Sequence, residues 1–92
     1  MKQIRFLPDD PTYCAAGPHL QCRASIDGSS ASYVITAEAL EDHFDARSCQ
    51  SDDLLSAFKM HRGHIEEVAR ILFEQTDSKE ITLHSGHFRF AG

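Results

Sequence analysis

Apolar side chains recur at alternating spacings of four and three along residues 52–75, the longest regular pattern in the chain. This spacing places them on one stripe of an α-helix. The stripe consists of Leu54, Phe58, Ile65, Val68 and Leu72, with His61 occupying one of its positions. A continuous helix of this length would span roughly 36 Å. Because that is long for a chain of 92 residues, we expect a bend near Gly63, an end near Glu74, or a partner chain.

A second pattern, the alternation of apolar and polar residues, covers residues 19–26 and predicts a strand with one face on the core. The Asp-Gly pair at 27–28 is favoured in tight hairpin turns, and the two serines that follow would lengthen the turn slightly. Residues 31–35 then return as the partner strand, with Tyr33 and Ile35 facing inward. The pattern therefore predicts an antiparallel β-hairpin.

Shorter segments complete the predicted fold. We expect a strand at 3–6, a loop or a ragged extended segment at 13–18, a short helix at 37–44 and a strand at 80–83, with Phe88 and Phe90 continuing or re-entering the sheet. Thr36 is placed to cap the short helix, and Ser51 or Asp52 to cap the long one. Together these elements predict a single α+β domain over residues 1–92. It has a small, mainly antiparallel sheet with the long amphipathic helix packed across one face.

Composition and charge narrow the class of protein. The hydrophobic fraction of 41% and the charged fraction of 25% are typical of a globular chain. The net charge is −5, and no basic cluster is present to displace counterions from phosphates. We therefore expect neither nucleic-acid binding nor attachment to an anionic membrane. Three cysteines at irregular spacing and the absence of an apolar leader indicate a cytoplasmic protein with free thiols.

His61 and Arg62 are the first candidates for a binding site, because a histidine interrupts the apolar stripe and an arginine follows it. In one interpretation both are structural: His61 is a hydrogen-bonded core residue and Arg62 anchors a loop or the C-terminus. In the other, the pair binds a carboxylate or a phosphate. Residue pattern alone leaves both interpretations open.

Catalytic and metal chemistry have weaker signals. His61 and His64 stand three residues apart, as do His84 and His87, but no cysteine lies at a short ligand spacing from either pair. We therefore expect no metal and no cofactor. Cys22 falls on the apolar face of its strand, and acidic neighbours of Cys49 disfavour a reactive thiolate. With no phosphate-binding loop or nucleophile motif, the sequence favours a protein that is not an enzyme.

A third group of residues lies beyond the main helical stripe and suggests an association surface. Its members are Met60, His64 and Ile71, together with Phe88 and Phe90. The alternative is that these are isolated exposed apolar residues, which are common on protein surfaces. The length of the predicted helix favours association, either as a homodimer or with another protein.

The chain also resembles a small bacterial family of uncharacterised proteins, the domain of unknown function DUF1488. The residues that carry the resemblance in the first half are Ala24, Asp27, Gly28, Tyr33, Val34, Ile35, Thr36, Ala37, Glu38, Ala39, Leu40 and Phe44. In the second half they are Asp52, Leu54, Ala57, Phe58, His61, Arg62, Ile65, Glu66, Ala69, Leu72 and Phe88. The resemblance covers roughly residues 19–90 and implies a shared fold, without implying an activity. The chain departs from the family pattern at Tyr33, at Asp53 and at Gly63.

These observations favour a non-enzymatic module that acts by self-association or by binding another protein. The alternative is a module that binds a small molecule or an anion through His61 and Arg62.

Overall fold

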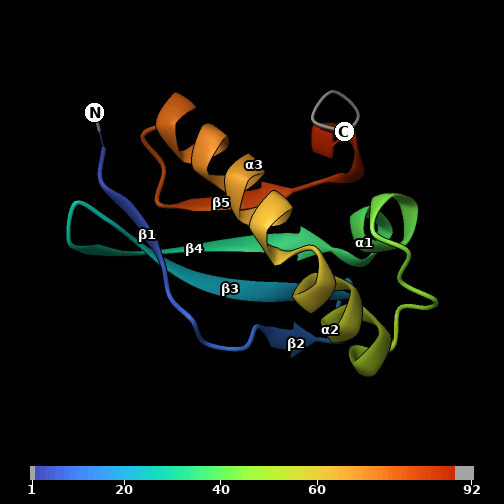
Figure 1. Cartoon of the computed structure of the whole chain (residues 1–92). Coiled ribbons are helices and arrows are strands. Elements are labelled where there is room, and N and C mark those ends of the chain that lie inside the picture. Colours follow the sequence, from blue (N-terminus) through green and yellow to red (C-terminus); the bar gives the residue numbers. More distant parts are fainter. Residues whose placement is uncertain (1, 89–92) are drawn as a thin grey trace.

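The computed structural model describes residues 2–88, which form a mostly antiparallel sheet of five strands and three α-helices (Figure 1). In chain order the elements are β1 (Ile4–Phe6), β2 (Thr12–Cys14), β3 (His19–Ile26), β4 (Ser29–Thr36), α1 (Ala37–His43), α2 (Ser51–Met60), α3 (Arg62–Gln75), β5 (Glu80–Leu83) and the 3-10 helix η1 (Ser85–Phe88). The predicted α+β class is confirmed.

The sheet has the strand order β1-β3-β4-β5, and β2 pairs with β3 next to β1. Its pairs are antiparallel except for β4 and β5, which are parallel because the chain crosses the sheet through the helices between them (Figure 1). Of the two interpretations of residues 13–18, the extended one is confirmed for Tyr13 and Cys14, which pair with Leu20 and His19. A strand of three residues is too short to show alternation, so only its pairing with β3 defines it.

The β3–β4 hairpin follows the prediction closely. Tyr33 and Ile35 face inward, as predicted, and are almost fully buried. Asp27 and Gly28 both have positive φ angles, of 51° and 85°, as the favoured two-residue hairpin turn requires. Ser29 already pairs with Ile26, so the turn is tighter than predicted.

Helices α2 and α3 lie across one face of the sheet and enclose the core (Figure 1). The predicted long helix is broken at His61, whose φ and ψ angles are −121° and 20°, close to the bend expected near Gly63. Its cap is not Ser51 or Asp52, because the helix begins after Gln50. The Ser48 hydroxyl accepts the Gln50 N–H at 3.1 Å and donates to the Asp53 carboxylate at 2.6 Å. This turn starts the helix one residue earlier than the cap preferences predict.

Helix α1 and η1 close the end of the molecule at which β5 finishes. The Thr36 hydroxyl accepts the Ala39 N–H at 3.1 Å, which confirms the predicted cap. Phe88 does not extend the sheet, because the chain turns at Ser85 and Phe88 packs against Phe44 instead. Phe90 lies outside the described residues. No helix within residues 2–88 is long and apolar enough to cross a membrane.

Candidate functional site

Arg62 binds the N-terminal segment to the start of α3. Its Nη2 donates hydrogen bonds to the carbonyl oxygens of Leu7, at 2.6 Å, and Asp9, at 3.1 Å. Its Nε donates to the Glu66 carboxylate at 2.9 Å, and the guanidinium lies 5.3 Å from the centre of the Phe58 ring. Burial lowers the Arg62 pKa, but the hydrogen bond and charge of Glu66 outweigh this effect and raise it. The guanidinium is thus a permanent cation engaged with its own chain.

His61 occupies the break between α2 and α3, where its N–H donates to the carbonyl oxygens of Ala57 and Phe58. Its half-buried ring lies 5.1 Å from the ring of Phe44. Arg62 packs on Phe58 and reaches the segment before β2. The two candidate ligand residues, adjacent in the sequence, therefore contact different parts of the molecule.

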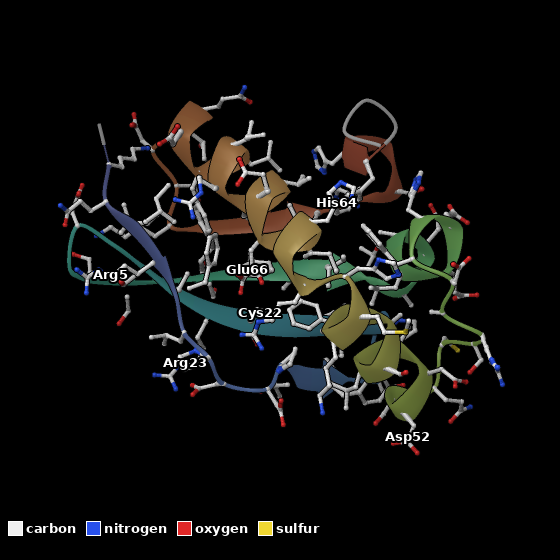
Figure 2. The ribbon with its side chains drawn as sticks, viewed as in Figure 1. Arg5, Cys22, Arg23, Asp52, His64 and Glu66 are labelled. Carbon is white, nitrogen blue, oxygen red and sulfur yellow. The ribbon has the colours of Figure 1, made fainter. Side chains whose placement is uncertain are left out.

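Phe44 is the centre of an aromatic cluster at the end of the sheet. Its ring meets that of Phe88 edge-on at 5.0 Å and that of His64 at 5.4 Å. His64 also lies 6.2 Å from Phe88, and Figure 2 shows it projecting from α3 towards η1. The structure thus brings together two of the predicted association residues. Phe88, however, is only 2% exposed and belongs to the core, whereas His64 is exposed.

Met60 and Ile71 are the two large hydrophobic residues exposed within the described part of the chain, at 78% and 45%. Met60 ends α2 and lies at a hollow of about 320 Å³ between that helix and the segment after α1. The residues that line the hollow are Phe44, Asp45, Arg47, Asp53, Ser56, Ala57 and Met60 itself. Ile71 lies on α3, outside this set. Met60, unlike Ile71, therefore lies beside this concave surface.

Within the described residues, the outer edge of β5 has few free backbone groups with which another strand could pair. The Ser32 N–H donates to the Lys79 carbonyl, so the backbone groups of Glu80, Thr82 and His84 face away from β4. The Ser78 hydroxyl accepts the Glu80 N–H and donates to its carbonyl. The His84 N–H donates to the His87 ring. Among the described residues this leaves the backbone of Thr82 open, which is a common protection of sheet edges.

Ser85 forms a contact that sequence reasoning missed. Its buried hydroxyl donates to the Asp42 carboxylate at 2.8 Å and lies 3.1 Å from Nε2 of His43. These three residue types also form hydrolase triads, but there the histidine receives the serine proton. Here the Ser85 hydroxyl donates its proton to Asp42 and not to His43, so the arrangement differs from a triad. The three side chains link η1 to α1. No spacing rule relates these positions, because the contact depends on the path of the chain between them.

Cys22 is a buried core residue, as its place on the apolar face of the strand predicted. Cys22 lies on β3 beneath the helices (Figure 2), and burial raises the pKa of its thiol to about 12 despite a hydrogen bond with Tyr33. A thiol with so high a pKa forms almost no thiolate at neutral pH. Among residues 2–88, no group of three or more His, Cys, Asp or Glu side chains is placed to hold a metal ion.

A hollow of about 580 Å³ lies beside α1. Three carboxylates of α1, those of Glu38, Glu41 and Asp42, line it together with Cys49 and His84. The helical spacing of the carboxylates is visible in the sequence. Their convergence with His84, by contrast, requires β5 to run beside β4.

Comparison with known proteins identifies one family. The sequence profile described as "Protein of unknown function (DUF1488)" matches residues 4–83 of the 92 residues. This match confirms the resemblance carried by the hairpin and helix residues. Neither the curated proteins nor the solved structures gave a match.

Proposed function

We propose that this chain, which belongs to the DUF1488 family, is a non-enzymatic module that associates with a second copy of itself through Met60. The observation that supports the proposal is the 78% exposure of Met60 beside a hollow lined by Phe44 and Ala57. An exposed methionine next to a concave surface is suited to docking, because its unbranched thioether fits irregular gaps.

The rim of the hollow favours a second copy as the occupant. Arg47 contributes a positive charge, while Asp45 and Asp53 contribute negative charges. A two-fold contact is self-complementary, so each Met60 enters the hollow of the other copy while Arg47 approaches the acidic residues of its partner. Each methionine transferred from water contributes about 1.5–3 kcal/mol. We therefore expect a weak dimer, formed by the helical side of the molecule and not by the blocked edge of β5.

The test is the dependence of molar mass on concentration, measured by sedimentation velocity. The unmodified protein should shift from one to two chains as its concentration rises, and Met60→Lys should remain a monomer. Ile71→Lys is the matched control, because it places the same charge on the other exposed apolar residue and should leave the dimer intact. Circular dichroism of each variant checks that the fold is retained.

Two results would reject this proposal. One is that the unmodified protein stays monomeric up to millimolar concentration. A specific contact of this kind would have a dissociation constant of roughly 1 mM or lower. The other is a Met60→Lys variant that dimerises as tightly as the unmodified chain. If Ile71→Lys alone abolishes the dimer, the contact surface lies on α3 instead.

The anion-binding alternative has less support. Arg62 already donates to two carbonyl oxygens and to Glu66, and the His61 ring packs on Phe44. An anion at Arg62 would have to compete with these contacts. We therefore treat the pair as structural, and the stability of an Arg62 variant tests that interpretation.

A further inference from the structure

The turn after β5 is closed by a hydrogen bond that requires a neutral histidine. The His84 N–H donates to Nδ1 of His87 at 2.9 Å, and the His87 N–H donates back to the His84 carbonyl at 3.0 Å. A ring nitrogen accepts a hydrogen bond only while it carries no proton. An imidazolium has a proton on both nitrogens, so a charged His87 cannot accept the His84 N–H.

His87 is exposed to solvent, so a proton can reach it. Imidazoles ordinarily take up a proton near pH 6.5, within the range of mildly acidic compartments and media. The ring of His84 lies 5.7 Å from that of His87, and charging both rings places like charges side by side. Acidification therefore removes the hydrogen bond and adds a repulsion in the same turn.

The segment closed by this turn covers part of the core. Phe88 ends η1 and is buried against Phe44, with ring centres 5.0 Å apart. The η1 segment is also held by the contacts of Phe88 with the rings of His43 and His64. The Ser85 hydroxyl adds a bond to Asp42 and a contact with His43. Opening the turn thus loosens the segment that carries Phe88.

We propose that η1 is a pH-sensitive strap, which protonation of His87 opens, releasing Phe88 from Phe44. Three other histidines contact this strap, namely His43, His64 and His84. The ionisable groups near it are Glu38, Glu41, Asp42 and His43 from α1, His64 from α3 and His84 from its own segment. His61, at the helix break, lies against Phe44 instead. His19, the sixth histidine, lies on β3.

The direction of the pKa shift agrees with this mechanism. Partial burial lowers the pKa of His87, and the nearby charge of His84 lowers it further. The closed turn therefore binds its proton less readily than an open one does. By linkage, the closed state has its full stability above about pH 6.5 and loses it as the pH falls through the lowered value.

The test measures the protection of the His84 amide against hydrogen exchange in the intact protein, by NMR, between about pH 8 and about pH 5. Protection is normalised to the intrinsic exchange rate at each pH. We expect it to fall roughly two- to tenfold in acid, which corresponds to the loss of one hydrogen bond. His87→Asn places an uncharged acceptor near the position of Nδ1, so its protection should not change with pH. His87→Ala has no acceptor, and its protection should be low at every pH.

His19→Gln is the control, since it removes a histidine outside the strap and should leave the pH profile unchanged. The proposal is overturned if the normalised protection in the unmodified protein does not vary with pH. It is equally overturned if His87→Asn retains the full pH dependence, because another group would then be responsible. Neither outcome depends on self-association, since the measurement is made at concentrations where the chain is monomeric.

Discussion

Replacing Arg62 by alanine should destabilise the fold more than any other substitution of an arginine in the described part of the chain. The variant loses two hydrogen bonds from a cation to the carbonyls of Leu7 and Asp9, and the ion pair with Glu66. Hydrogen bonds to charged groups contribute about 1.5–3 kcal/mol each, and an ion pair within one helix about 0.3–0.5 kcal/mol. Because water replaces part of these contacts, we expect a total loss of about 3 kcal/mol.

A loss of this size is easily measured. For a chain of under 100 residues it lowers the melting temperature by roughly 12–24 °C. Urea unfolding followed by far-ultraviolet circular dichroism gives the free energy directly. Arg62→Lys should recover only part of the loss, because an ammonium cannot bind Glu66 and the two carbonyls in the fork geometry of a guanidinium.

Arg70→Ala is the matched control on the same helix. Arg70 lies 3.6 Å from Glu67 and stacks 5.5 Å from the Phe6 ring, but its side chain is 43% exposed. Its removal should cost less than about 1 kcal/mol. If Arg62→Ala is no less stable than Arg70→Ala, the anchoring role is refuted. Binding of inorganic phosphate that depends on Arg62 would then support the ligand-binding interpretation.

Further experiments test the cap of α1 and the thiols. Thr36→Ala removes the cap of α1 and should cost about 1 kcal/mol in urea unfolding, whereas Thr36→Ser should retain most of the stability. At neutral pH, iodoacetamide should label the exposed Cys49 and leave Cys22 unmodified until the protein unfolds. The raised pKa of Cys22 also implies that stability decreases as the pH rises from 9.0 towards 12, because the unfolded thiol ionises first. Labelling of Cys22 in the folded protein as fast as Cys49 would contradict its burial.

Local patterns were sufficient to predict the hairpin and the helical region. The alternation in residues 19–26 corresponds to β3, and the Asp-Gly pair forms the turn because both residues tolerate a positive φ. The helical stripe buries Leu54, Phe58 and Ile65, as the period requires. Such patterns depend on neighbouring residues alone, so they are readable without the rest of the molecule.

The candidate sites were less predictable, since each one joins segments that are distant in the sequence. The sequence singles out the turn at His61 and Arg62, and the structure breaks the helix there. Whether Arg62 binds a ligand or its own chain depends on where residues 7–9 pass, and no periodicity records that path.

Contacts between distant segments also decide the structure at residues 12–14 and at Phe88. Residues 12–14 are too few to define β2 by alternation, so the strand is defined by its pairing with β3. Phe88 has the sequence character of a strand or interface residue, yet it is buried because Phe44 and His64 surround its site. Periodicity determines which face of a helix or strand is apolar, because that depends on residues a few positions apart. How distant elements pack decides which partner each face has and which residues stay exposed. This packing places Met60 beside its hollow and η1 over the core.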